Sequence, residues 1–502
     1  MNENLEAKKV WSDEDLLDAG IPVREIPFAT IGGGLGSFAL VDLLRMVGVP
    51  TSDIAIVSVD RDPQNSFQRL CSASQLGADG PLRSDSSSRI DNFWGFPGYA
   101  LGAAWKRKSL GPLARVTTEP ILAEYFTPTG SQVFDGVKRE ADRIGWAGMI
   151  QPGKAVAVRR RGGGGFFVIQ ETSSAPSSPL VAWHARYVHI APGYPGVNIA
   201  PDLLDFRAIN PGDNRTAHSY ESHEHIYDSL AGRGGTVLIR GSGDTSAHLL
   251  HRLCIERVRS DSDIRIVHLI RDFVAQPTPF PEVGRARRPG RNGYSLQQFV
   301  FPRAAGGGEI ARIVSSKEES VRSTLMAALG APSKPPIRSW EAELDRGRRE
   351  GWYAVHHGEV DSLEATPDGR IRVDWHAHDA GTPSSDLVDF IIDATGVVCG
   401  IEADPLLADM VSCGIGSPNP IGRLAVGPAF DLATSEPWDG RVYASGAITF
   451  GGTVIPVAVF WGLHYAALRI CDDLARQGFC RRFTPWRSML AWAKWVGRVR
   501  LP

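Results

Sequence analysis

The alternation of apolar and polar positions predicts buried strands separated by amphipathic helices. The apolar run 28–31 ends in a cluster of glycines and is followed by a helical pattern through Arg45. The next apolar run, 53–60, completes the unit. A buried strand, a glycine turn, a helix and another buried strand in this order form a βαβ unit, in which the two strands lie parallel.

The same order of elements recurs in the middle of the chain. A strand at 236–240 ends in the glycine turn 241–243, a helical pattern follows, and 264–270 has the pattern of the next strand. Two other strands end in turns of small residues, 191–193 and 394–396, on either side of this second unit. We expect the chain to cross between two domains at these turns, so that the second domain is inserted in the first.

A length of 502 residues exceeds what one hydrophobic core usually supports, which favours several domains. The expected fold class is α/β, with two Rossmann-like, three-layer dinucleotide-binding domains. The expected segments are a polar leader (1–25), the first domain in two parts (26–235 and 389–480), the inserted domain (236–388) and a basic, tryptophan-rich C-terminal helix (481–502).

The first glycine turn has the residues that a dinucleotide site needs. Gly32 lets the strand turn sharply, Gly34 lets the backbone approach a pyrophosphate, and the small Ser37 allows close helix packing. Asp60 ends the next strand, where a carboxylate can accept hydrogen bonds from ribose hydroxyls. The residues expected to bind here are Gly32, Gly33, Gly34, Leu35, Gly36, Ser37, Asp60 and Arg61. The alternative is a glycine-rich turn that binds no ligand.

The second turn places Gly241, Gly243 and Ser246 in the equivalent positions. The following strand ends in Arg271, and a guanidinium there can bind a 2′-phosphate, which favours NADPH over NADH. The alternative is that Arg271 is a solvated strand end and that the neighbouring Asp272 binds the ribose. The residues expected to bind here are Gly241, Ser242, Gly243, Asp244, Thr245 and Arg271.

Composition narrows the range of functions. The 54 basic and 56 acidic residues give a formal net charge of −2, so the surface lacks the broad positive field that gathers nucleic acid. The chain has no apolar run of membrane-spanning length and no signal-peptide core near residue 1, so we expect a cytoplasmic location. None of the six cysteines forms a Cys-x-x-Cys pair, which argues against a dithiol or metal centre.

The order of these motifs along the chain resembles that in the two-dinucleotide-binding flavoproteins. The matching segments are 31–37, 191–195, 240–247, 267–271, 393–396 and 444–446. The resemblance implies FAD at the first turn and NADPH at the second. Trp94, in the aromatic loop 91–99, would then face the flavin or the substrate, and Gly446 and Gly452 would lie near the flavin. The alternative for the aromatic loop is a packed cluster within the core.

Within that superfamily, the spacing of the two turns resembles the class B flavin-dependent monooxygenases, which include N-hydroxylases and Baeyer–Villiger enzymes. The pair His218-Ser219 resembles the His-Ser pair of that group. The wider pattern departs from it, because Gly212 stands six residues before His218 instead of four and no Trp-Pro or Trp-Asp pair follows closely. The alternative is that His218 is an interdomain packing residue.

The resemblance implies an FAD- and NADPH-dependent monooxygenase of secondary metabolism. Such an enzyme inserts one oxygen atom from O₂ into a small organic metabolite through a flavin C4a-(hydro)peroxide. An NADPH:acceptor flavin oxidoreductase and a non-catalytic flavin redox sensor remain alternatives. Dimers are common among such folds, so a homodimer is one expected assembly, and the sequence assigns no catalytic residue.

The end of the chain combines aromatic and basic residues. Residues 481–500 hold Trp486, Trp492 and Trp495 among five arginines and one lysine. We expect this helix to pack on its own protein through the tryptophans. The alternative is a helix that lies on a membrane surface.

Overall fold

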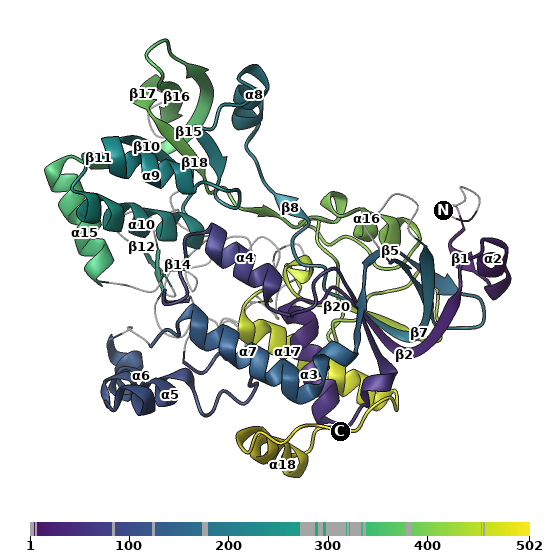
Figure 1. The fold of residues 1–502 in the computed structure, drawn as a ribbon. Helices are drawn as coiled ribbons and strands as arrows, with labels where there is room; N and C mark the ends of the chain where they lie inside the picture. Colours follow the sequence, from purple (N-terminus) through teal and green to yellow (C-terminus); the bar gives the residue numbers. More distant parts are fainter. Residues whose placement is uncertain are drawn as a thin grey trace.

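The computed structural model describes residues 5, 8–82, 86–122, 126–172, 179–271, 287–289, 295–297, 318, 321, 333–334, 338–377, 383–452, 454 and 457–502. Two large sheets lie apart from one another, and each is covered by helices (Figure 1). This is the mixed α/β architecture with two Rossmann-like units that the sequence predicts.

The first sheet has the order β1-β5-β6-β7-β2-β3-β4, with β20 paired to β7. Its strands β2, β3, β4, β7 and β20 are parallel, whereas β5, β6 and β7 pair antiparallel. The strands are β1 (Val10–Trp11), β2 (Val23–Ile31), β3 (Ile54–Ser58), β4 (Ile150–Pro152), β5 (Lys154–Arg161), β6 (Phe166–Glu171), β7 (Leu180–Ile190) and β20 (Arg441–Ala444).

Helices cover both faces of this sheet because its central strands are buried on both sides. On one face α3 (Leu35–Met46) packs between α7 (Gly130–Ile144) and α17 (Phe460–Arg476). Phe38 to Arg45 of α3 are all buried, which explains the nearly continuous apolar pattern of that helix. On the other face α16 (Pro405–Ser412) packs against β5.

The second sheet has the order β17-β16-β15-β11-β10-β18-β9. Its strands are β9 (Thr216–His218), β10 (Gly235–Arg240), β11 (Ile264–Ile270), β15 (Tyr353–Ala365), β16 (Ile371–Ala377), β17 (Pro383–Val388) and β18 (Phe390–Asp393). The helices near it are α8 (Pro201–Ile209), α9 (Glu224–Arg233), α10 (Asp244–Ser260) and α15 (Arg338–Glu350). The strands of this sheet therefore lie between residues 216 and 393, a wider span than the expected 236–388.

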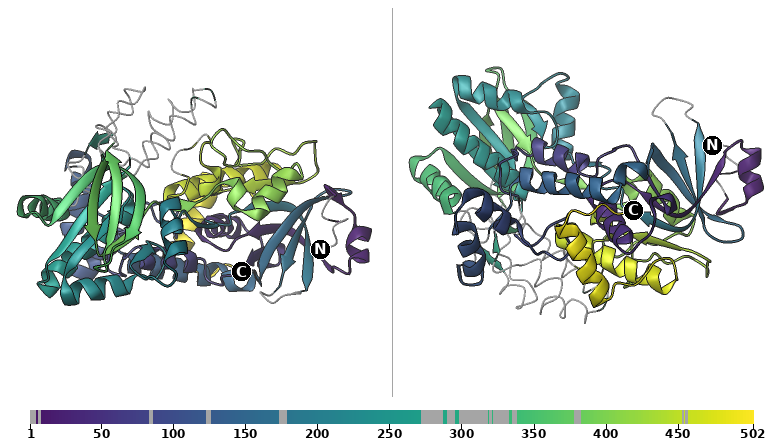
Figure 2. Two further views of the ribbon diagram at one scale, coloured as in Figure 1. Left: turned by 90° about the horizontal axis from the view of Figure 1, so that it is seen from above. Right: turned by 60° about the horizontal axis from the view of Figure 1, so that its bottom comes forward.

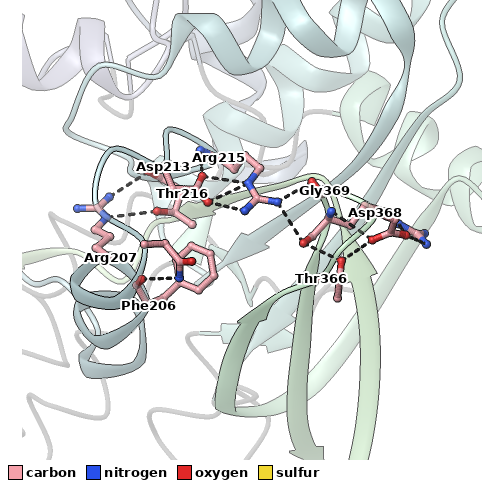
Figure 3. Close-up of polar contacts among 10 residues, drawn as sticks. Phe206, Arg207, Asp213, Arg215, Thr216, Thr366, Asp368 and Gly369 are labelled. Carbon is pink, nitrogen blue, oxygen red and sulfur yellow. Dashed lines mark hydrogen bonds and ion pairs between the residues drawn. The ribbon is translucent and has the colours of Figure 1, made fainter.

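A partly buried arginine network anchors the start of β9 at the edge of this sheet (Figure 3). Arg215 pairs with Asp213 and donates hydrogen bonds to the carbonyls of Gly369 and Arg370, in the turn between β15 and β16. Arg207 of α8 donates to the hydroxyl and the carbonyl oxygen of Thr216. The hydrogen bonds from Arg215 to the β15–β16 turn join residues far apart in the chain, so local sequence patterns do not reveal them.

The two crossings between the sheets run side by side. The short strands β8 (Gly196–Val197) and β19 (Val397–Val398) pair antiparallel, directly after the turns 191–193 and 394–396. The Asn198 N–H donates to the Gly396 carbonyl, and the Thr395 hydroxyl donates to the Asn198 carbonyl. In Figure 1, β8 lies between the two sheets. The expected insertion of one nucleotide-binding unit within the other is confirmed.

The other elements lie around these two units. They are α2 (Asp13–Asp18), α4 (Asn65–Ala73), α5 (Tyr99–Arg107), α6 (Gly111–Leu122), α18 (Pro485–Val496) and a small sheet of β12 (Arg287–Pro289), β13 (Ser295–Gln297) and β14 (Ser333–Lys334). The expected polar leader, 1–25, contributes β1 and the start of β2, and the Trp11 side chain is fully buried.

Two findings about the described residues bear on function. None of their helices combines the length and the apolar character that crossing a membrane requires. Nor do they contain a group of three or more His, Cys, Asp or Glu side chains arranged to hold a metal ion.

Two glycines of similar backbone conformation provide a test of the first turn. Gly32 has φ +89°, and an added Cβ would lie 2.8 Å from the Ala191 carbonyl carbon. Gly48 has φ +94°, and an added Cβ there would have no heavy atom within 4 Å. We predict that Gly48→Ala lowers the free energy of unfolding by about 1–2 kcal/mol, the cost of a left-handed backbone. Gly32→Ala should lower it by at least about 3 kcal/mol, because β7 must also move. Urea unfolding measures both, and equal losses would contradict the steric argument.

Candidate cofactor site

The first two glycines of the first turn lie beneath the site. The Gly32 N–H donates to the Val57 carbonyl (2.9 Å), and the Ala191 carbonyl covers Gly32 on the side where a Cβ would stand. An added Cβ at Gly33 would meet the Ser58 side chain, 2.7 Å from its Cβ. Gly32 and Gly33 therefore allow β2, β3 and β7 to meet closely, and neither lines the cleft described below.

The next residues of the turn face an open cleft. Gly34 is the N-cap of α3, no side chain caps the helix there, and a Cβ at Gly34 would enter empty space. The unpaired N–H groups and the dipole at a helix start attract a phosphate. The backbone at Gly34, Leu35 and Gly36 therefore fits the pyrophosphate of a dinucleotide.

The cleft above this turn has a volume of about 460 Å³ and a mainly apolar wall. It is lined by Gly34, Leu35, Gly36, Pro63, Ser66, Phe67, Arg69, Leu70, Ala73, Ala191, Pro192, Gly193, Tyr194, Gly196, Val197, Tyr220, Val397, Ser445, Gly446, Ala447, Ile448, Ala458, Phe460 and Leu463. Of the residues expected near a flavin, Gly446 is among them. Gly452 is not, and a Cβ there would lie 3.1 Å from Cγ2 of Val426.

Asp60 is engaged by a residue that sequence reasoning missed. Arg69 of α4 donates two hydrogen bonds to the Asp60 carboxylate (2.9 and 2.7 Å), and the Ser66 hydroxyl donates a third (2.9 Å). The Arg69 hydrogen bonds hold the pKa of Asp60 below its usual value. Arg69 itself borders the cleft, so the strand end presents an Arg–Asp pair to it. The Arg61 side chain is exposed, and its carbonyl accepts a hydrogen bond from Trp146.

A buried chain of hydrogen bonds crosses the base of the cleft. The Ser37 hydroxyl bonds to that of Thr30 (2.8 Å), Thr30 bonds to Nδ1 of His189 (2.8 Å), and Nε2 of His189 bonds to the Ser445 hydroxyl (2.9 Å). Burial lowers the pKa of His189 to about 3, so the ring is neutral at ordinary pH. The chain joins α3, β2, β7 and the residue after β20, and it holds the Ser445 hydroxyl at the cleft wall.

The second turn repeats the construction of the first. Gly241 has φ +109°, and a Cβ there would lie 2.5 Å from the Ala394 carbonyl oxygen. Gly243 is the N-cap of α10 without a side-chain cap, and the Ser246 hydroxyl donates to its carbonyl (2.7 Å). Nε2 of His268 bonds to the Gly241 carbonyl (2.7 Å), and burial lowers the pKa of His268 to about 4. This turn also fits a dinucleotide phosphate.

Arg271 follows β11, where the sequence places the 2′-phosphate contact. Its side chain is largely exposed, and its Nε lies 4.0 Å from Oε1 of Glu359. Asp272, the alternative ribose ligand, lies outside the described residues.

One side chain connects the two turns. The Tyr220 side chain lines the cleft at the first turn, and its hydroxyl bonds to Oγ1 of Thr245, in the first turn of α10 (2.9 Å). Near it, Nε2 of Gln75 donates to Oε1 of Glu224 on α9 (2.7 Å). Tyr220 has no sequence signal of its own except its place after the pair His218-Ser219.

His218 and Ser219 are completely buried and do not border the cleft. His218 lies in β9, its N–H donates to the Glu221 carboxylate, and its Nδ1 accepts from the Tyr220 N–H (3.2 Å). This buried position agrees with the alternative interpretation, in which His218 is a packing residue between the domains.

Trp94 lies away from the cleft. Its indole N–H donates to the Ser488 hydroxyl of α18 (2.8 Å), and the indole groups of Trp492 and Trp495 donate to the carbonyls of Phe96 and Asp91. The aromatic loop is therefore packed against the surface helix α18. The expected docking of this helix on its own protein holds for Trp492 and Trp495, whereas Trp486 is exposed.

No protein-family model matches the sequence, and no curated protein matches it. Solved structures match the fold. An ornithine hydroxylase from Pseudomonas aeruginosa is 16% identical, with a TM-score of 0.62, over 90% of this chain and 99% of that one. The cadaverine monooxygenase of desferrioxamine biosynthesis from Erwinia amylovora, solved with FAD, is 13% identical, with a TM-score of 0.66, over 92% and 96%.

An ornithine N-hydroxylase from Kutzneria sp. 744, solved with reduced FAD, NADP⁺ and L-ornithine, is 15% identical. Its TM-score is 0.62, over 91% of this chain and 100% of that one. The chain therefore has the two-dinucleotide-binding flavoprotein fold, in the form found in N-hydroxylating monooxygenases. The fold that the motifs resemble is confirmed.

The hydrogen-bond chain predicts how stability depends on pH. The unfolded chain protonates His189 near pH 6.5, whereas the folded protein keeps the ring neutral down to about pH 3. The free energy of unfolding therefore falls as the pH falls below 6.5, by up to about 1.4 kcal/mol per pH unit from this residue. His189→Gln should reduce the slope between pH 5.5 and 4.5 by about that amount.

Thr30→Val is the matched control, because it removes the Thr30–His189 and Thr30–Ser37 hydrogen bonds and keeps the histidine. It should lower the free energy of unfolding by about 1–3 kcal/mol at every pH and leave the slope as it is. Urea unfolding across the pH range measures both variants. An unchanged slope in His189→Gln would show that this histidine does not titrate as described.

Proposed function

We propose that this protein is an FAD- and NADPH-dependent monooxygenase that hydroxylates the nitrogen of a small primary amine, with O₂ as the oxygen source. The observation that carries the proposal is Tyr220, which lines the cleft at one glycine turn and bonds to Thr245 at the other. Two dinucleotides held at these turns would approach one another at this residue. The shared fold supports an amine substrate, because the matched enzymes are named for ornithine and cadaverine.

In this proposal the backbone at Gly34, Leu35 and Gly36 holds the FAD pyrophosphate. The Ser445 hydroxyl, oriented by His189, lies beside Gly36, 3.2 Å from where a Cβ of that residue would stand. This hydroxyl and the backbone at Gly446 are proposed to contact the same cofactor. Bound FAD supplies the hydride-accepting and O₂-activating chemistry. The first domain is proposed as 26–235 with 389–480, apart from β9 and β18, which belong to the second sheet. A cytoplasmic location and a homodimer stay predictions.

Other cleft residues exclude water from the proposed reaction. The cleft is lined with apolar surface from Phe67, Phe460 and Leu463, which keeps solvent away from the proposed reaction. Arg69 stands at the cleft with its charge paired to Asp60. The wall therefore carries little net charge, which suits a neutral amine nitrogen, the nucleophilic form that N-hydroxylation requires.

At the second turn, the backbone at Gly241, Ser242 and Gly243, with Asp244 and Thr245, is proposed to hold NADPH. The start of α10 supplies the N–H groups for its pyrophosphate. Arg271 is proposed to bind the 2′-phosphate.

The proposal predicts a specific isotope result. The purified protein should be yellow, release FAD on denaturation and lose its visible absorbance when NADPH is added without O₂. A panel of ornithine, lysine, cadaverine and putrescine should contain at least one amine that accelerates NADPH oxidation. Under ¹⁸O₂, mass spectrometry should find one labelled oxygen atom in the hydroxylamine product. Accelerated NADPH oxidation with an unlabelled product would instead indicate an NADPH:acceptor reductase, and a bound flavin that NADPH does not reduce would indicate a sensor.

Arg271 is expected to select NADPH. Arg271→Ala should raise the KM for NADPH about 10- to 100-fold, the loss of a charge-assisted phosphate contact, and leave the KM for NADH nearly unchanged. Steady-state kinetics with both nucleotides measure the two constants. Equal increases would contradict the phosphate contact at this residue and leave the flavin assignment as it stands.

A further inference from the structure

The C-terminal helix α18 has two apolar faces. One face is docked on the aromatic loop, where Trp492 and Trp495 donate hydrogen bonds to loop carbonyls. On the other side, Trp486, Met489 and Leu490 follow the i, i+3, i+4 spacing that places residues on one face of a helix. These three side chains are exposed, and Trp486 keeps 70% of its surface accessible. Intramolecular packing therefore leaves one apolar face of this helix uncovered.

A second exposed apolar group lies next to α18. The loop that holds α18 continues into α5, and Phe96 of that loop stacks on Trp492 with ring centroids 6.3 Å apart. Phe96 is itself exposed, and beyond it Trp105 and Leu110 are 88% and 77% exposed. Both α5 and α18 lie along the lower side of the molecule in Figure 1, and both come forward in the right-hand view of Figure 2.

We call this surface the basic–aromatic face and define it by Phe96, Trp105, Leu110, Trp486, Met489 and Leu490. The two segments that carry it contain charges of one sign only. Residues 92–118 and 477–502 contain no aspartate or glutamate, although the whole chain has a formal net charge of −2. The basic residues of these segments are Lys106, Arg107, Lys108, Arg115, Arg481, Arg482, Arg487, Lys494, Arg498 and Arg500.

We propose that the basic–aromatic face binds the surface of an anionic lipid bilayer. Exposed tryptophan and leucine side chains that are ringed by lysine and arginine match the acyl boundary and the phosphate layer of such a membrane. A second copy of this chain would bring like charges together across the face, which opposes a dimer there. A nucleic acid would leave Met489 and Leu490 without apolar contacts.

The binding is peripheral, because no helix among the described residues is fit to cross a membrane. The indole of Trp486 and the side chains of Met489 and Leu490 would enter the headgroup region. The docked side of α18 stays on the aromatic loop. The inference is independent of the reaction proposed above, since the face includes no residue that lines the cleft.

Vesicle flotation with the full-length protein tests this inference. The protein should float with vesicles of equal parts phosphatidylglycerol and phosphatidylcholine and stay at the bottom with phosphatidylcholine alone. Raising the salt to about 0.5 M should release most of it, because the attraction is largely electrostatic. Failure to float with the anionic vesicles at low salt would overturn the proposal.

Two variants and a control make the test specific. Trp486→Ser combined with Leu490→Ser should lower the partition coefficient at least tenfold, and so should Lys106→Glu combined with Arg107→Glu on the other segment. Leu17→Ser on α2, a site that is 78% exposed but outside the face, should bind as the unaltered protein does. Circular dichroism checks that each variant is folded, and the Lys106/Arg107 variant leaves α18 intact if the first variant does not fold.

Sedimentation velocity without lipid tests whether a second copy of the chain, rather than a membrane, binds this face. A dimer of the unaltered protein that dissociates in the Trp486/Leu490 variant would mean that two copies meet at this face, and the membrane proposal would be wrong. Equal binding of all variants to the anionic vesicles would also overturn it.

Discussion

Both nucleotide sites depend on one steric constraint: a carbonyl of the neighbouring parallel strand occupies the place of a side chain. The Ala191 carbonyl covers Gly32, and the Ala394 carbonyl covers Gly241. Because each glycine lacks a Cβ, the segments 191–193 and 394–396 can pass directly over the turns. They then enter β8 and β19, which pair with one another. The two glycines therefore determine both the shape of each turn and the route by which the chain crosses between them.

Polar contacts then hold in place the strands and helices that the two glycines allow to pack closely. The buried chain from Ser37 to Ser445 joins four elements of the first unit, and His268 has a similar place under the second turn, between Gly241 and Tyr353. A buried histidine with two partners orients its neighbours, and its neutral state costs little while the solution is near neutral pH. The cleft wall above the first chain is mainly apolar, so specific positioning and exclusion of water come from different layers of that site.

Local patterns predicted the glycine turns, the helices after them and the crossings, because each depends on residues adjacent in the chain. These patterns failed where the interacting residues are distant from one another in the sequence. Asp60 has the offset expected of a ribose ligand, yet Arg69 engages it because α4 brings that guanidinium back to the strand end. Trp94 looked like part of a cofactor wall, but its partner is Ser488, almost four hundred residues later in the chain. β9 has three residues, too few for a periodic pattern, and its anchors lie in a hairpin of the same sheet.

The place of Trp94 also shows how the cleft and the basic–aromatic face are connected. Leu463 of α17 lines the cleft, and the adjacent His464 points into the protein, where its Nε2 bonds to the Ile90 carbonyl (3.1 Å). Phe93 contacts the His464 ring and also packs against Trp94, which bonds to α18. Burial lowers the pKa of His464 to about 4, so this connection keeps one protonation state over the physiological range. α18 is thus coupled to the cleft wall through Trp94, Phe93 and His464, so a displacement of α18 would strain the Trp94 hydrogen bond or separate packed rings.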